Sequence, residues 1–136
     1  MSKMSRVLTV AALSAIAMGA FAGNAFAANR FAKVKIRNAT HGPIHYDIQW
    51  GDDNWQACTV WPNQVQHHSW RYPKPNANES PRLRIRFDAD MSPITYWHRY
   101  ELRKDACPDT SPEYGKPYVF VRDGSGGRYI DLKNDN

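Results

Sequence analysis

The sequence lacks the motifs that usually identify an enzyme, a redox protein or a membrane-spanning protein. It contains no Gly-x-Ser-x-Gly, His-Glu-x-x-His or phosphate-loop motif. Its two cysteines are too far apart to form a Cys-x-x-Cys redox motif. After residue 27, no apolar run reaches the roughly 18 residues that a transmembrane helix needs. We therefore expect a non-catalytic protein that binds no cofactor and has no transmembrane segment.

A strong excess of one charge is also missing. The formal net charge is +5, and it falls to +3 without Lys3 and Arg6, which lie in the leader described below. An excess of this size permits contact with anionic glycans or phospholipid headgroups, but it is not the strongly basic footprint of a nucleic-acid-binding protein. We therefore expect no nucleic-acid partner.

The first 27 residues have the pattern of a secretory signal peptide. Lys3 and Arg6 precede an apolar, alanine-rich segment over 7–22, and Ala25-Phe26-Ala27 has small residues at both positions that a signal peptidase recognises. Cleavage after Ala27 would leave residues 28–136 as a single domain. We expect a secreted or periplasmic protein, and the alanine-rich leader is typical of bacteria.

Both cysteines, Cys58 and Cys107, lie in the expected mature chain. In an exported protein such a pair most simply forms one disulfide, and free thiols or a metal pair are the alternatives. The bridge would close a loop of about 50 residues and stabilise the domain by roughly 4 kcal/mol in the chain-entropy model. We expect the Cys58–Cys107 disulfide to form.

The mature sequence alternates apolar and polar residues with a period of two, which is typical of half-buried antiparallel strands. In one segment Leu83, Ile85 and Phe87 alternate with three arginines, which predicts that the apolar residues are core and the arginines face solvent. Prolines and glycines separate such segments, and we expect strands over 31–38, 43–50, 55–61, 65–72, 82–88, 94–103, 117–122 and 128–133. The pattern predicts an all-β fold: a small antiparallel β-sandwich, or a partly closed barrel, of seven or eight short strands.

Aromatic residues are the first candidates for a binding surface, because saccharide rings stack on them. The alternation places Trp97 on the polar side of its strand, and it places Trp55 and Trp61 on the side opposite Cys58. We expect these three rings to point outward, whereas Trp50 shares its face with Ile48 and belongs to the core. The competing interpretation is that all of the large rings simply fill a small core.

Arginines form a second candidate surface. Arg82, Arg84 and Arg86 would project from one strand face roughly 7 Å apart, and Arg99 would join them if its strand pairs with theirs. Guanidinium groups bind sulfate, carboxylate or phosphate with two parallel hydrogen bonds. Ordinary cross-strand ion pairing with nearby acids is the alternative explanation.

Histidines and acidic pairs give weaker signals for a metal. His45 could form a copper or zinc site with His67 or His68 of a neighbouring strand, although the spacing alone is not specific. Asp88-x-Asp90 could bind calcium, although it does not match an EF-hand loop. His98 lies on an apolar face and is expected to be a hydrogen-bonded core histidine. We assign no metal ligand.

Three function classes follow from these features. We favour an exported, non-catalytic binding protein that recognises a glycan, an envelope polymer or an extracellular protein through Trp55, Trp61 and Trp97, with Arg82, Arg84, Arg86 and Arg99. One alternative is a secreted inhibitor or toxin-like effector acting through an exposed loop, for which 73–81 and 105–116 are the candidates. The other alternative is a small periplasmic metal-binding protein that uses the histidines.

Overall fold

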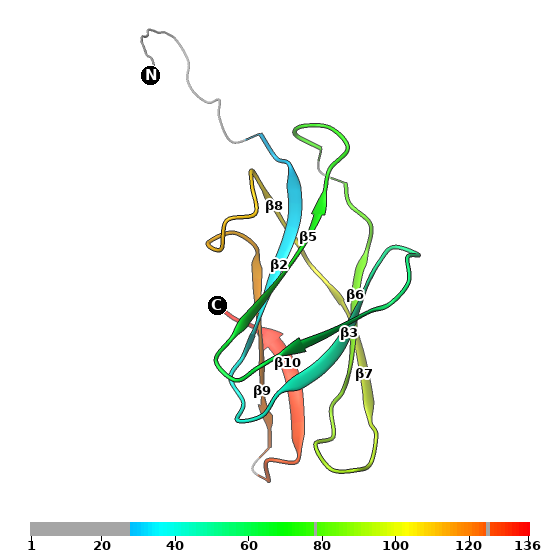
Figure 1. Ribbon diagram of the computed structural model, residues 1–136, viewed down its shortest axis with the longest axis vertical. Coiled ribbons are helices and arrows are strands. Elements are labelled where there is room, and N and C mark those ends of the chain that lie inside the picture. Colours follow the sequence, from blue (N-terminus) through cyan, green and yellow to red (C-terminus); the bar gives the residue numbers. More distant parts are fainter. Residues whose placement is uncertain (1–27, 78, 125) are drawn as a thin grey trace, which may run out of the picture.

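The computed structural model describes residues 28–77, 79–124 and 126–136, and in this part of the chain it shows strands and no helix (Figure 1). The strands are β2 (Phe31–Asn38), β3 (Ile44–Trp50), β4 (Gln56–Val60), β5 (Val65–Arg71), β6 (Leu83–Asp88), β7 (Trp97–Leu102), β8 (Asp105–Cys107), β9 (Lys116–Asp123) and β10 (Tyr129–Asn134). The predicted all-β fold is confirmed. The predicted signal peptide lies outside the described residues.

The strands form two sheets. The four-stranded sheet has the order β4-β3-β6-β7 and is antiparallel throughout. The five-stranded sheet has the order β10-β9-β2-β5, with the short strand β8 beside the first part of β2. Its β2–β9 pair is parallel, so this sheet is mixed rather than purely antiparallel. The two sheets do not join into a closed barrel, and the sandwich prediction is the better description.

The core lies between the inner faces of the two sheets. Phe87 of β6 is fully buried, and its ring meets Phe120 of β9 nearly at right angles, with 5.0 Å between the centroids. Tyr46 of β3 contacts the same Phe120 ring at 5.7 Å. The predicted alternation along β6 is confirmed, because Leu83 and Ile85 are also fully buried. The buried cluster consists of Val34, Ile36, Ile44, Tyr46, Ile48, Val60, Leu83, Ile85, Phe87, Ala89, Leu102, Tyr118, Phe120, Ile130 and Leu132.

The segment before β7 differs from the prediction. We expected one strand over 94–103, but β7 begins at Trp97, and Ile94 and Tyr96 are 62% and 54% exposed. The chain instead forms a loop between the last residue of β6 and Tyr96, which we call the 88–96 loop. Side-chain oxygens of Asp88, Asp90 and Ser92 hold it, because they accept hydrogen bonds from its backbone amides. Such local bonds compete with pairing in a sheet.

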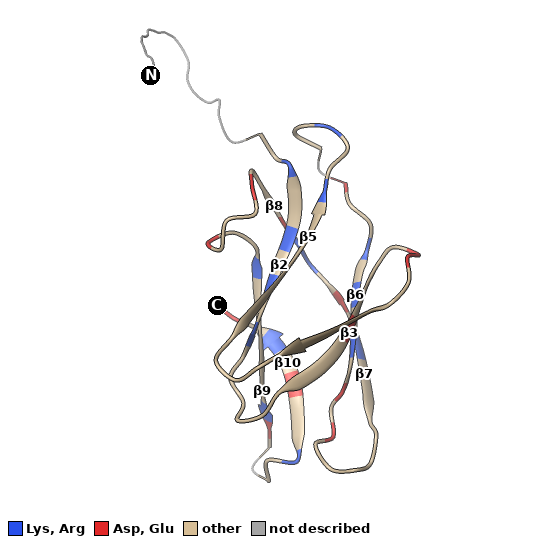
Figure 2. Cartoon of the chain, viewed as in Figure 1, with Lys and Arg blue, Asp and Glu red and all other residues tan. Residues whose placement is uncertain are grey.

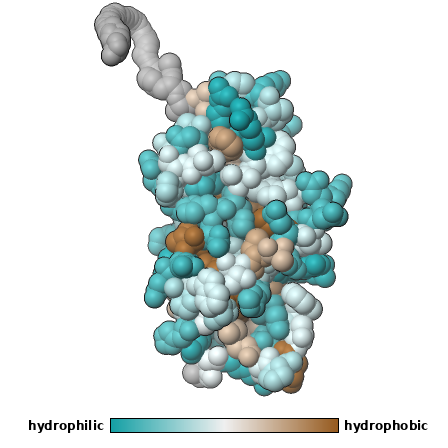
Figure 3. Space-filling view, in the orientation of Figure 1, coloured by the Kyte–Doolittle hydropathy of each residue, from teal (hydrophilic) through white to brown (hydrophobic). Residues whose placement is uncertain are grey.

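Most of the exposed large hydrophobic side chains lie between the end of β6 and the end of β7. Met91, Ile94, Tyr96, Trp97 and Tyr100 are all exposed, and they lie in the β6–β7 connection and in β7. On the face of the molecule that Figure 3 shows, hydrophobic residues are scattered among hydrophilic ones. The β6–β7 region is therefore the first place to look for an interaction surface.

The predicted disulfide is not present, because both cysteines are free. Cys58 lies on β4 of the four-stranded sheet, opposite Tyr46 in the strand register. Cys107 lies on β8 of the other sheet, opposite Phe31. The two thiols therefore belong to different sheets and have different neighbours, which the sequence could not reveal because it gave no sign of β8. Burial raises the pKa of each thiol, so both stay protonated at neutral pH.

Replacing Phe87 by alanine should destabilise the domain far more than replacing its neighbour Arg84. Phe87→Ala opens a cavity between the sheets, and such changes cost about 3–5 kcal/mol. Arg84→Ala removes only hydrogen bonds at the outer face, and it should cost less than about 1.5 kcal/mol. Chemical denaturation of residues 28–136 measures both free energies of unfolding. A larger loss for Arg84→Ala would show that the strand register is wrong.

The half-buried His68, which faces the core, should make the fold less stable as the pH falls. Its Nε2 lies 2.7 Å from the Tyr46 hydroxyl, and burial, aided by the His67 charge, lowers the pKa of His68 to about 4. The unfolded chain protonates this group near its ordinary pKa of about 6.5. The free energy of unfolding should therefore fall by up to about 3 kcal/mol between pH 7 and pH 4.

His68→Gln should remove most of this pH dependence, while His41→Gln at an exposed position is the matched control. Denaturant titrations at several pH values measure the slope. An unchanged slope in His68→Gln would contradict the assignment.

Candidate functional site

The outer face of the four-stranded sheet carries most of the residues that the sequence analysis selected. Because alternate residues of each strand point away from the core, they line up in rows across the sheet. One row, which we call the arginine row, contains Ala57, Asp47, Arg86 and Arg99 on the strands β4, β3, β6 and β7. On one side of it lie the pairs His45–Thr59 and Asp88–Trp97, and on the other lie Gln49, Arg84 and Glu101. Figure 2 shows the basic positions recurring along β6.

A shallow hollow of about 220 Å³ lies beside the arginine row, on the side that carries Trp97. Trp97 is 53% exposed and forms one wall. The small side chain of Ala57 leaves space at the surface, and the complete lining is His45, Tyr46, Asp47, Ala57, Cys58, Thr59 and Trp97. The hollow is smaller than the roughly 300–1,000 Å³ of pockets that enclose whole small molecules. It therefore fits a single ring or terminal group of a larger ligand.

The polar groups of the hollow are arranged for hydrogen bonding rather than for nucleophilic attack. Nδ1 of His45 lies 2.8 Å from the hydroxyl of Thr59. Burial, together with the Asp47 charge, raises the pKa of the Cys58 thiol, so the reactive thiolate is disfavoured. His45, Asp47 and Thr59 were not predicted as ligand-binding residues. The alternation along 44–50 pointed His45 and Asp47 outward, but only the strand register brings them to Trp97.

Arg86 and Trp55 form a stacked pair next to the hollow. The guanidinium carbon of Arg86 lies 4.1 Å from the centre of the Trp55 ring, and its Nε donates a hydrogen bond of 2.9 Å to Asp47. Both members of this ion pair are about three-quarters buried. Trp55 is therefore on the outer side as predicted, but its ring is half-buried by an arginine. It supports Arg86 instead of offering a free stacking surface.

The remaining predicted residues lie at the edges of this face. Arg82 pairs with Glu101 at 3.4 Å, and Arg84 donates hydrogen bonds to Gln49 and to the carbonyl of Gly51. Arg99 is exposed on β7. Trp61 is 54% exposed, but it follows the end of β4 and does not line the hollow. The structure thus brings Trp97, Arg86 and Arg99 together and leaves Trp61 outside.

The histidines that could have formed a two-histidine metal site are separated. His45 lies on the outer face of the four-stranded sheet, whereas His67 lies on the outer face of the other sheet. There, Nδ1 of His67 is 3.0 Å from Nζ of Lys33. His68 points into the core toward Tyr46. Within residues 28–77, 79–124 and 126–136, no three His, Cys, Asp or Glu side chains converge as a metal site would require.

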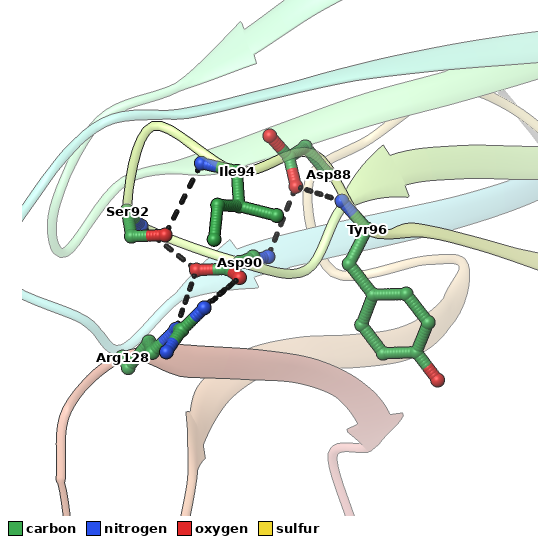
Figure 4. Close-up of polar contacts among 6 residues, drawn as sticks. All are labelled: Asp88, Asp90, Ser92, Ile94, Tyr96 and Arg128. Carbon is green, nitrogen blue, oxygen red and sulfur yellow. Dashed lines mark hydrogen bonds and ion pairs between the residues drawn. The ribbon is translucent and has the colours of Figure 1, made fainter.

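The Asp88-x-Asp90 acids were candidates for a calcium site, but Asp90 binds the side chain of Arg128 instead. Asp90 is buried, and Arg128 binds its carboxylate with hydrogen bonds of 3.0 to 3.2 Å from Nε and Nη2 (Figure 4). Oδ1 of Asp88 accepts hydrogen bonds from the amides of Asp90 and Tyr96. The Arg128 guanidinium, aided by hydrogen bonds from Ser92, holds the pKa of Asp90 well below its usual range. The guanidinium thus supplies the positive charge that a cation would otherwise provide.

One loop proposed for the inhibitor alternative is held against the sheet. The loop over 105–116 begins with β8, and the buried Lys33 donates hydrogen bonds of 2.9 and 2.8 Å to the carbonyls of Ser111 and Tyr114. In contrast, the loop over 88–96 projects from the end of the sandwich, next to the turn before β10 (Figure 1). This loop carries the exposed Met91 and Ile94, and the sequence analysis missed it because it assigned part of it to a strand.

Comparison of the chain with family models, with curated proteins and with solved structures finds no match. A membrane-spanning helix is not found among the described residues. The argument about function therefore rests on the geometry of the outer face and of the 88–96 loop.

Removing the Arg128 side chain should loosen the 88–96 loop without unfolding the sandwich. Arg128→Ala leaves the buried Asp90 carboxylate without its partner, which disfavours the closed loop. Amide hydrogen exchange should become faster at Asp90, Ser92 and Tyr96, and it should stay slow in the core strand β6. Arg122→Ala, in the neighbouring strand, is the control. Equal exchange in both variants would contradict the role assigned to the Asp90–Arg128 pair.

Proposed function

We propose that this is an exported, non-catalytic binding protein that recognises a saccharide of a glycan or envelope polymer on the outer face of its four-stranded sheet. One sugar ring would occupy the hollow beside Trp97, with its apolar face against the indole. The observation that carries the proposal is an exposed tryptophan forming the wall of a hollow whose other sides bear His45, Asp47 and Thr59.

The chemistry of the hollow suits a sugar ring. A pyranose presents an apolar face that stacks on an aromatic ring, and hydroxyls at its rim that need both donors and acceptors. The Asp47 carboxylate is an acceptor, while the Thr59 hydroxyl and the His45 ring can each donate or accept. The small volume of the hollow supports a ligand of which only one residue is enclosed, as in the recognition of a polymer.

Rigidity of the face also supports a binding role. Asp47 is held by Arg86, and Arg86 is held by the Trp55 ring. His45 and Thr59 contact each other across neighbouring strands. Groups held in place by packing and by hydrogen bonds lose little conformational freedom when a ligand binds, which raises affinity. The sheet thus offers a preorganised surface.

The second candidate is a secreted inhibitor that acts through the 88–96 loop. The specific observation in its favour is a projecting loop held by the Asp88 and Asp90 hydrogen bonds, with Ile94 62% exposed near its tip. Rigid loops of this kind bind protein clefts at low entropic cost. An Ile94→Ala variant that loses an extracellular protein partner while keeping saccharide binding would favour this candidate.

Trp97→Ala should weaken saccharide binding by about 1 kcal/mol or more, which is at least fivefold in Kd, because it removes the aromatic wall. The matched control is Trp61→Ala, since Trp61 is equally exposed but lies outside the hollow. Residues 28–136 are first screened against peptidoglycan, lipopolysaccharide and a panel of neutral and acidic polysaccharides. Isothermal titration then compares the variants on each oligosaccharide that binds. Equal losses in the two variants, or binding to none of these polymers, would contradict the proposal.

A further inference from the structure

We infer that the saccharide bound on this face carries an anionic group, a carboxylate, sulfate or phosphate, which lies between Arg86 and Arg99. This inference rests on the proposed function and specifies the ligand class of the same site. It is carried by three features of the outer face: two arginines directly opposite each other, a guanidinium with free donors, and the absence of an acid paired with Arg99 among the described residues.

Arg86 and Arg99 are direct partners in the antiparallel register of β6 and β7. Side chains at such positions have their Cβ atoms about 5 Å apart, and like charges there repel each other. The repulsion is relieved when an anion bridges the two guanidinium groups. A like-charged pair between β6 and the edge strand β7, on a sheet face whose other arginines are paired, is therefore a candidate anion site.

Contacts within the described part of the protein fix the position of the Arg86 guanidinium but engage only one of its three nitrogens in a hydrogen bond. Its Nε donates to Asp47, and the Trp55 ring supports the plane of the guanidinium from one side at 4.1 Å. In the described structure, its two terminal nitrogens make no hydrogen bond to a protein acceptor. Arg84 of the next row, in contrast, turns its guanidinium to Gln49 and Gly51. Arg86 thus keeps donors available in a fixed position.

The acids on this face do not neutralise Arg99. Asp47 is paired with Arg86, and Glu101 is paired with Arg82. Asp88 accepts hydrogen bonds from the backbone amides of the 88–96 loop. Among the described residues, the Arg99 guanidinium has no hydrogen bond or ion pair. The arginine row therefore has two positive charges against one negative charge, and the excess lies at Arg99.

The excess charge is next to the hollow. Asp47 belongs both to the lining of the hollow and to the arginine row, and Trp97 is two residues from Arg99 on the same face of β7. A sugar ring stacked on Trp97 would therefore place a carboxylate, sulfate or phosphate substituent within reach of both arginines. Bidentate contacts of this kind are strong and select anions of planar or tetrahedral shape.

The first experiment tests the anion site without any saccharide. Sodium sulfate and sodium acetate are titrated into residues 28–136 at constant ionic strength, and NMR follows the Nε–H signals of the arginines and the indole N–H of Trp97. We expect saturable shifts at Arg86 and Arg99 in the wild type, and their loss in Arg99→Gln. The matched control Arg103→Gln removes the same charge from an exposed position farther along the chain, and it should keep the shifts.

The Tm of the same variants shows whether Arg99→Gln disturbs the fold. Because Arg99 opposes Arg86, Arg99→Gln should leave the Tm in low-salt buffer unchanged or higher. A large drop in Tm would show that Arg99 has a structural partner, and it would overturn the inference.

The second experiment uses saccharides that differ only in charge. Oligogalacturonate is compared with its methyl ester, and sulfated dextran oligomers are compared with unmodified dextran. We expect at least about tenfold tighter binding of an acidic form than of its neutral form, as suits two charge-assisted hydrogen bonds. This preference should disappear in Arg99→Gln and persist in Arg103→Gln.

The outcomes separate the two proposals. Equal binding of acidic and neutral forms, with loss of both in Trp97→Ala, would overturn the anionic ligand and leave the proposed function standing. Saturable sulfate shifts without binding of any polymer in the screen would keep the anion site and overturn the saccharide function. Non-saturating shifts, equal in wild type and both arginine variants, would show only diffuse attraction and overturn the inference.

Discussion

Contact between the inner faces of two sheets is the interaction on which the rest of this structure depends. Phe87 of β6 and Phe120 of β9 meet at its centre, and the fully buried side chains of β2, β3 and β6 surround them. Burial of large apolar side chains is the main favourable term in folding. Because strand residues alternate, burying Phe87 forces Arg86 to the other side of the sheet. The packing of the core thus decides which residues of each strand point to the outer face.

Polar contacts then hold the loops, in place of the disulfide that the cysteines suggested. Lys33 is buried beneath the loop that follows β8, and it donates hydrogen bonds to two of that loop's carbonyls. Gly115 closes this loop with a φ of +119°, and a Cβ there would lie 3.2 Å from Cγ of Lys33. At the opposite end, Arg128 holds Asp90 of the 88–96 loop. Each loop is tied to a segment distant in sequence, which restricts its motion.

The candidate site combines three properties of the outer face. Trp97 remains exposed beside a hollow, Arg86 is stacked and ion-paired yet keeps free donors, and Arg99 faces Arg86 without an acid to offset it. An exposed aromatic residue adds little to the stability of the free protein, and like charges directly opposite each other cost stability. Such costs are typical of surfaces kept for a ligand, because stability and function compete at binding sites.

The sequence by itself determined the all-β fold, the approximate position of eight strands and the two faces of β6, because period-two alternation is a local property of the chain. It also placed Trp97, Arg86 and Arg99 outside the core. Only the tertiary structure decided that β8 exists, that Cys58 and Cys107 lie on different sheets, and that residues 88–96 form a loop. It alone brought His45, Asp47 and Trp97 to one hollow and set Arg99 against Arg86. These outcomes depend on which strands pair and in which register, and pairing between distant segments leaves no mark on the pattern within any one strand.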